Sequence, residues 1–100
     1  MKEQMYIIAA SCYKCKKDIN IATIYDNTTM RGPESFSSEE IKIAQNNDVV
    51  IKEHHSYTMD TNYLANTCLG CNAFIGQHFL HEYLIDAMYG DYEHKKIDLI

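Results

Sequence analysis

Four cysteines carry the clearest chemistry in the sequence, and they form two C-x-x-C pairs, Cys12 with Cys15 and Cys68 with Cys71. A two-residue spacing lets both sulfurs of a tight turn face one ion, and zinc binds four thiolates tetrahedrally at about 2.3 Å. We therefore predict that the two pairs share one structural Zn²⁺. Iron fits the same tetrahedron, but no feature of the sequence indicates electron transfer. Four thiolates leave no open coordination position, so the predicted zinc is not catalytic.

Two other interpretations of the cysteines remain open. They could be redox pairs, although a redox C-x-x-C usually opens a helix in a thioredoxin-like fold, or they could be buried thiols without a metal. The short apolar run Met5 to Ala10 does not resemble a secretory signal. We therefore expect a cytoplasmic protein, in which disulfides are rarely maintained. Because zinc contributes on the order of 10 kcal/mol to the folding of finger peptides, we expect the metal-free chain to be poorly folded.

The elements around the first pair follow from apolar patterns. Met5 to Ala10 predicts a buried strand, and the alternation of Ile19, Ile21 and Tyr25 predicts a second. The first pair would then lie in the turn between them. Downstream, a polar loop is expected over residues 26–37, then a short helix that begins with a capping box of Ser37 and Glu40 and ends near Asn46. Further strands are predicted at residues 49–51 and 63–65, joined by a polar turn over 56–62.

The segment after the second pair predicts an amphipathic helix from Asn72 to Tyr89, with Gly90 as its C′ residue. Its apolar face would comprise Ala73, Leu80, Leu84, Ala87 and Met88. Its polar face would comprise His78, His81, Glu82 and Asp86. Surface positions are the simplest interpretation of the histidines, and a second metal shared by His78 and His81 is an alternative.

Helical periodicity directly after Cys71 favours a treble clef over a zinc ribbon. A treble clef takes its last two ligands from the start of a helix, whereas a zinc ribbon places them between two strands. We therefore expect a small α+β, treble-clef-like zinc domain spanning residues 1–100. It would hold a short β-sheet of two to four strands, one short helix and a C-terminal amphipathic helix.

The stretch from Tyr63 to Cys71, followed by Gly76 and Phe79-Leu80-His81, resembles a pattern in small bacterial zinc-binding proteins. These carry an early C-x-x-C and a late Y-x-x-N-x-C-x-x-C-x-x-x-x-G-x-x-F-L-H, are mostly uncharacterised, and are of the treble-clef or ribbon kind. The resemblance covers about a third of the chain and supports the metal site without implying an activity. Many such knuckles have glycine after the second cysteine. Here the residues are Lys16 and Asn72, and lysine would be mildly strained if the turn needs a left-handed backbone.

One enzymatic alternative is a metal-dependent nuclease of the HNH type, which is built on a treble clef and needs a histidine to activate water, an asparagine and a further ligand on the last helix. The residue types occur in this order as His54 or His55, then Asn62 or Asn66, then Asn72 or His78. No aspartate immediately precedes the histidine pair, and the chain is acidic. We therefore assign no catalytic residue.

Charge and composition limit the partners. The formal net charge is −5, and a zinc ion with four thiolates adds about two negative charges, which opposes generic nucleic-acid binding. A local basic cluster, Lys14, Lys16 and Lys17, nevertheless keeps nucleic acid as an alternative partner. No stretch is long enough to span a membrane. We predict a zinc-stabilised binding or adaptor module acting on a protein partner.

Overall fold

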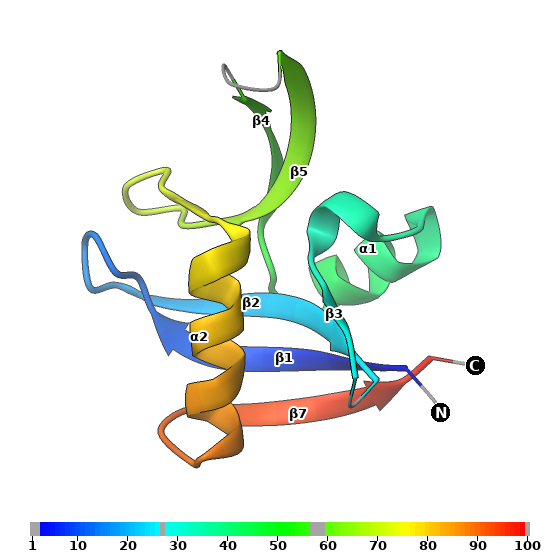
Figure 1. Cartoon of the computed structure of the whole chain (residues 1–100). Coiled ribbons are helices and arrows are strands. Elements are labelled where there is room, and N and C mark those ends of the chain that lie inside the picture. The colour runs from blue at the N-terminus through cyan, green and yellow to red at the C-terminus, as the bar shows by residue number, and fades with distance from the viewer. Residues whose placement is uncertain (1–2, 27, 57–59, 100) are drawn as a thin grey trace.

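A computed structural model describes residues 3–26, 28–56 and 60–99, with the side chains of Ser56, Gln77 and His78 outside the described set. These residues form two antiparallel sheets and two α-helices, which confirms an α+β fold (Figure 1). None of the described helices is long and apolar enough to cross a membrane.

The large sheet has the strand order β3-β2-β1-β7. Its centre is the predicted hairpin of β1 (Gln4–Ser11) and β2 (Asp18–Tyr25), which pair in continuous antiparallel register from Gln4↔Tyr25 to Ser11↔Asp18. Two edge strands were not predicted. β3 (Met30–Arg31) lies within the segment expected to be a loop, and β7 (Glu93–Asp98) pairs with β1 near the end of the chain.

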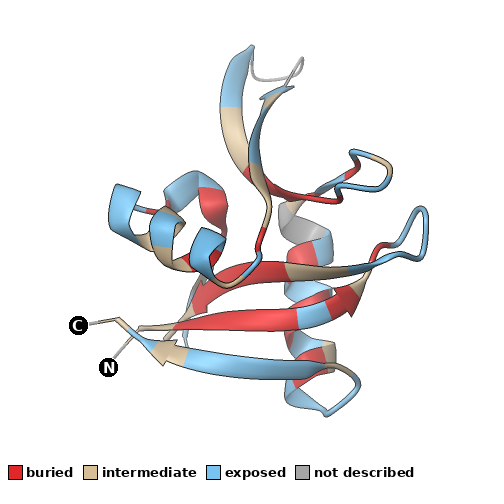
Figure 2. Cartoon of the chain, turned by 180° about the vertical axis from the view of Figure 1, so that it is seen from behind, coloured by how far each residue is buried: buried red, intermediate tan, exposed pale blue. Residues whose placement is uncertain are grey.

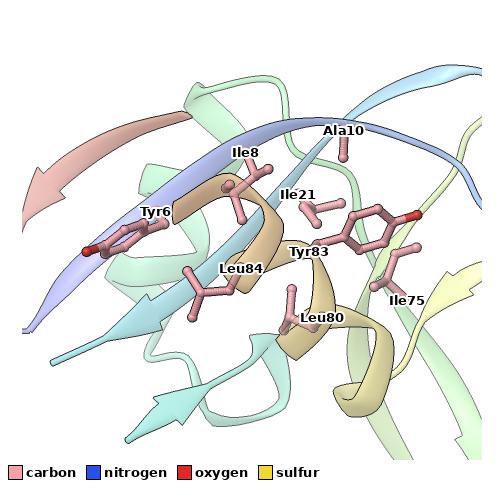
Figure 3. Close-up of a cluster of buried hydrophobic side chains, with 9 residues drawn as sticks. Tyr6, Ile8, Ala10, Ile21, Ile75, Leu80, Tyr83 and Leu84 are labelled. Atoms are coloured by element: carbon pink, nitrogen blue, oxygen red, sulfur yellow. The ribbon is translucent and has the colours of Figure 1, made fainter. Parts of the chain in front are cut away.

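The two faces of the large sheet pack against different elements. Met5, Tyr6, Ile7 and Ile8 of β1 are all buried, because alternate side chains of a strand point to opposite faces. On one face, Tyr6, Ile8 and Ile21 pack against the long helix α2 (Gln77–Met88), as Figure 3 shows. On the other, residues including Met5 and Ile7 share a cluster with Phe36, Ala44 and Val49 around α1 (Ser38–Asn46). The sheet is thus the middle layer between two helices (Figures 1 and 2).

The start of α1 confirms the predicted capping box. The Glu40 amide donates to the Ser37 hydroxyl at 3.2 Å, and the Ser37 amide donates to the Glu40 carboxylate at 2.8 Å. A 3-10 turn, Pro33–Ser35, precedes the helix. Arg31 of β3 then joins this region to the first strand, because its guanidinium binds the carboxylates of both Glu3 and Glu40 at 2.8–3.0 Å. These bonds lower the pKa of both carboxyl groups.

The small sheet consists of β4 (Ile51–Ser56), β5 (Thr61–Thr67) and β6 (Phe74–Ile75) in that order. The strand predicted at 63–65 is found within β5, but the one predicted at 49–51 is displaced, because β4 begins only at Ile51 and Val49 makes an isolated parallel bridge with Asn20. The predicted polar turn is shorter than expected, since residues 56, 61 and 62 belong to the two strands. Residues 57–59 of the predicted turn lie outside the described residues. Ile75 joins the small sheet to the α2 side of the core.

The predicted start of the last helix is wrong. Phe74 and Ile75 pair as a strand with Thr67 and Asn66, and Gly76 has extended backbone angles as the N-cap, so α2 begins only at Gln77. Leu80, Leu84 and Ala87 are buried as expected. Met88 is not, with 51% of its surface exposed, and Tyr83 takes its place in the core. At the other end, Gly90 has a φ of 93° and follows the C-cap residue Tyr89, as predicted.

This boundary corrects the expected zinc fold in two respects. Cys68 and Cys71 lie between two strands and not at the start of a helix, which is the arrangement predicted for a ribbon rather than for a treble clef. The amphipathic helix is also not the last element, because β7 follows it. The periodicity correctly predicted a helix, but the first residues of the predicted helix pair with β5 as a strand instead.

Candidate metal centre

The first cysteine pair lies in the turn between β1 and β2, as the sequence predicts, and the second in the turn between β5 and β6. The two turns emerge on the same side of the molecule (Figure 1). Cys12 and Cys68 are buried, Cys71 is partly buried, and Cys15 is exposed. The site is therefore sealed on the core side and reaches the surface at Cys15.

The two turns have the same backbone design. In the first, the amide of Cys12 donates to the carbonyl of Lys17 at 2.8 Å, and the amide of Lys16 donates back to the carbonyl of Cys12 at 3.0 Å. In the second, the equivalent bonds join Cys68 with Ala73 and Asn72 with Cys68, both at 2.8 Å. The residue after each second cysteine is left-handed, with φ of 66° at Lys16 and 61° at Asn72. The strain expected at Lys16 therefore has its geometric cause in the structure.

The four Sγ atoms lie within 4.8 Å of one another, and among the described residues this is the one group of three or more His, Cys, Asp or Glu side chains positioned to hold a metal ion. Cys12 and Cys71 approach to 3.6 Å, and Cys15 and Cys68 to 3.5 Å. A disulfide needs sulfurs about 2.05 Å apart, and all four thiols are free. Sulfurs bound tetrahedrally at about 2.3 Å would be about 3.8 Å apart. The donor set and its spacing therefore fit a four-thiolate ion.

No protein family, curated protein or solved structure matches this chain. The donor set and geometry of the four cysteines are therefore what identify the candidate metal centre.

Backbone amides favour the thiolate form that a metal requires. Burial opposes ionisation of Cys12, but the amides of Cys15 and Lys14 outweigh it and lower the pKa of the Cys12 thiol to about 6. The amide of Cys71 likewise lowers the pKa of Cys68. At Cys15 the amide of Lys17 acts in the same direction, yet the neighbouring thiols raise the pKa to about 11. A dication among the sulfurs would instead favour the thiolate form of all four.

Gly70 explains how closely the two turns approach. A Cβ placed there would lie 2.9 Å from Cδ of Lys17, 3.5 Å from Sγ of Cys15 and 3.6 Å from Sγ of Cys68. A larger side chain would therefore press on the stem of Lys17 and on the sulfurs. The sequence offered no signal for this role, because it depends on the distance between two turns that are far apart in the chain.

The residues of the nuclease alternative do not assemble into one site. Asn66 is fully buried, and its amide bonds both the N–H and the C=O of Ala22, at 2.9 and 3.0 Å. Neighbouring His54 and His55 point to opposite faces of β4. His54 bonds the Thr67 hydroxyl, and His55 bonds the side chain of Asn62, each at 2.8 Å.

The two remaining nuclease candidates add nothing to a catalytic group. Asn72 is the exposed left-handed residue of the second turn. The side chain of His78 lies outside the described set, so the alternative metal pair of His78 and His81 is untested. Within the described side chains, the nuclease alternative gains no support.

A group of aromatic side chains that the sequence did not reveal extends from the first cysteine turn and the start of α2 to the small sheet. Tyr13, between the first two cysteines, stacks on Phe79 of α2 with ring centroids 4.6 Å apart. Its hydroxyl donates to the Phe74 carbonyl at 3.3 Å. The ring of Phe74 in turn contacts His54 at 5.1 Å and Tyr63 at 6.0 Å. We call Tyr13, His54, Tyr63, Phe74 and Phe79 the aromatic face.

A groove crosses the large sheet where α1 does not cover it. Its floor is Ala9, which is exposed although it lies on the central strand between Asn20 of β2 and Glu93 of β7. In Figure 2 a short exposed stretch, in pale blue, separates two buried stretches of β1, in red. Two hollows of about 530 and 350 Å³ adjoin there and share Ala9, Asn20, Asp48 and Glu93. We call this feature the Ala9 groove.

Proposed function

We propose that the chain is a zinc-stabilised binding module that docks on a basic segment of a protein partner through the Ala9 groove. Zinc is the ion that best fits four thiolates in two short turns, and with no open coordination position it acts structurally. The two turns resemble the knuckles of a ribbon more than those of a treble clef. The metal would hold the small sheet against the large one and so fix one end of the groove.

The charge of the groove is the observation that carries this proposal. Across its two hollows the groove has four carboxylates, against the ammonium groups of Lys17 and Lys95 and the imidazole of His94. The carboxylates are those of Asp18, Asp48, Asp91 and Glu93. Within the described residues no ion pair or side-chain hydrogen bond engages any of them. This excess of carboxylates over ammonium groups attracts a cationic partner and steers its approach.

The walls of the groove suit lysine and arginine side chains in particular. Val50 and Leu69 line the larger hollow together with the carboxylates. Lysine and arginine lay an aliphatic stem along apolar surface while the charged head stays at a polar rim. A pocket of this volume is in the range that holds a few side chains. A basic, extended segment therefore matches both the shape and the charge.

Calorimetric titration of the metal-loaded chain with a lysine- and arginine-rich peptide tests the proposal. We expect binding that weakens as salt rises, and no binding of a peptide of the same length with glutamine in place of the basic residues. Asp48→Asn and Glu93→Gln should each weaken binding about threefold to tenfold. Glu39→Gln removes a charge from the exposed face of α1 and serves as the control. Failure of the basic peptide to bind, or equal losses in all three variants, would refute the proposal.

A further inference from the structure

The outer face of the small sheet carries rings and a positive charge but no acid. Directly paired residues of antiparallel strands lie on the same face, so the pairs His54↔Tyr63, Lys52↔Ala65 and Thr67↔Phe74 define it. The contacts of His54 with Thr67 and Phe74 agree with this placement. Among the described residues of this face, no aspartate or glutamate occurs. The opposite face turns Asn66 and Ile75 toward the core.

The rings of the aromatic face form two groups, Tyr13 with Phe79 and Phe74 with its neighbours on the small sheet, linked by the bond from the Tyr13 hydroxyl to the Phe74 carbonyl. Tyr13 is 39% exposed and Phe74 is 41% exposed, although both are large apolar side chains next to a buried core. Each ring is also held in position by its neighbours, Tyr13 by Phe79 and Phe74 by His54 and Tyr63. A ring that is both exposed and fixed loses little entropy when a flat ligand stacks on it.

One exposed lysine is adjacent to Tyr13 in the sequence, and another lies on the same face of the small sheet as Phe74. Lys14 follows Tyr13 in the first turn, and Lys52 lies on the outer face of β4. Both are exposed, and within the described residues neither takes part in an ion pair. Lys16 is exposed in the same turn as Lys14. The acidic groups of the Ala9 groove lie in the large sheet or in the segments that follow α1 and precede β7. The net charge of −5 is therefore unevenly distributed over the surface.

We propose that the aromatic face binds single-stranded nucleic acid, with unpaired bases stacking on Tyr13 and Phe74 and phosphates contacting Lys14 and Lys52. Stacking platforms flanked by basic side chains are the common means of binding single strands without sequence preference. A purely apolar protein partner would leave the lysines unused. An acidic protein segment would leave the stacking geometry of the rings unused. This activity is independent of the peptide binding proposed for the Ala9 groove.

Fluorescence anisotropy with labelled oligothymidylate and oligouridylate tests the inference on the metal-loaded full chain. None of the proposed interactions involves the sugar, so we expect both probes to bind with similar affinity. Phe74→Ala should weaken binding about tenfold, as loss of one stacking ring does in single-strand binding proteins. Replacing both Lys14 and Lys52 with glutamine should flatten the slope of log affinity against log salt by about 0.7 for each phosphate that is no longer neutralised.

Two control variants separate this surface from generic effects. Tyr89→Ala removes a tyrosine that is 83% exposed at the end of α2, and Lys42→Gln removes an exposed lysine of α1. Both should bind as the unsubstituted chain does. Far-UV circular dichroism and metal content establish that every variant is folded, and the lysine variants, altered only at exposed positions, remain informative if Phe74→Ala does not fold.

The outcomes are distinct. Affinity lost with Phe74→Ala and salt dependence lost with the lysine double variant, but not with the controls, would support the inference. It would be overturned if neither oligonucleotide bound at low salt, or if Lys42→Gln weakened binding as much as the double variant. It would also be overturned if Phe74→Ala abolished binding of a protein while no oligonucleotide bound, because the face would then be a protein surface. None of these results depends on Asp48 or Glu93.

Discussion

In the large sheet the central strand β1 buries side chains on both faces, whereas in the small sheet no described side chain of β4 is fully buried. Burial in β5 is confined to Ala65, Asn66 and Thr67, at the end next to the metal centre. The large sheet is thus held by two hydrophobic layers. The small sheet is attached through the cysteines, the amide of Asn66, the buried side chain of Ile75 and the partly buried side chain of Ile51. Two sheets in one short chain therefore depend on different forces.

This contrast refines the expectation that the metal-free chain is poorly folded. Because the hydrophobic layers of the large sheet contain few residues of the small one, loss of the metal should loosen chiefly β4, β5, β6 and the two cysteine turns.

Removal of the metal is the largest perturbation that the comparison predicts. Chelation, or Cys68→Ser, should abolish a contribution on the order of 10 kcal/mol and expose the amides of β5 and β6 to hydrogen exchange. Amides of β1 and β2 should remain protected, since two helices still cover them. Hydrogen exchange with mass spectrometry measures both regions at once. Equal loss of protection in the two sheets would show that the metal supports the whole fold.

Leu84→Ala should act on the opposite region. Leu84, on the side of α2 that faces the large sheet, is 2% exposed, and removing a buried leucine side chain costs about 3 kcal/mol. We expect the loss to appear in the large sheet, with metal content unchanged. Chemical denaturation of the metal-loaded protein measures the free energy of unfolding. Ile85→Ala, one residue along the helix and 37% exposed, should cost under about 1 kcal/mol. Similar costs for both variants would contradict the assigned core.

Asn66→Ala should detach the small sheet from β2. The change leaves the N–H and C=O of Ala22 without their partners, which costs about 2–3 kcal/mol when such groups stay buried. Asn62→Ala removes an exposed asparagine from the same strand and should change stability by about 0.5 kcal/mol or less. Denaturation midpoints compare the two variants. A cost at Asn66 no larger than that at Asn62 would mean that the amide is not what joins the sheets.

Lys16→Gly is the smallest expected effect, and it distinguishes the two cysteine turns. Relief of a left-handed lysine gains about 1–2 kcal/mol, and glycine returns about 0.5–1 kcal/mol through the entropy of the unfolded chain. A net stabilisation of about 0.5 kcal/mol should follow. Asn72→Gly should gain less, because asparagine tolerates this conformation. Lys14→Gly makes the same change of charge without a positive φ and should destabilise. Thermal melts of the loaded proteins rank the three variants.

Local signals accounted for much of the molecule before its structure was known. The cysteine spacing located both turns of the candidate metal centre, Ser37 and Glu40 located the start of α1, and Gly90 marked the end of α2. Each of these signals acts within four residues, where the chemistry of the side chains dictates the backbone. The alternation of apolar residues likewise predicted the β1–β2 hairpin, because one tight turn joins its strands.

The tertiary structure decided what depends on distant partners. β7 exists because its residues pair with β1, with Asp98 opposite Gln4, and its own sequence is too polar to indicate a strand. Phe74 and Ile75 form a strand and not the start of a helix, because their backbone groups pair with those of β5. Asn66, a catalytic candidate by its residue type, became a link between sheets because the free edge of β2 lies beside it. The aromatic face likewise formed only when Tyr13, Phe74 and Phe79 were brought together, because residue types alone carry no distances.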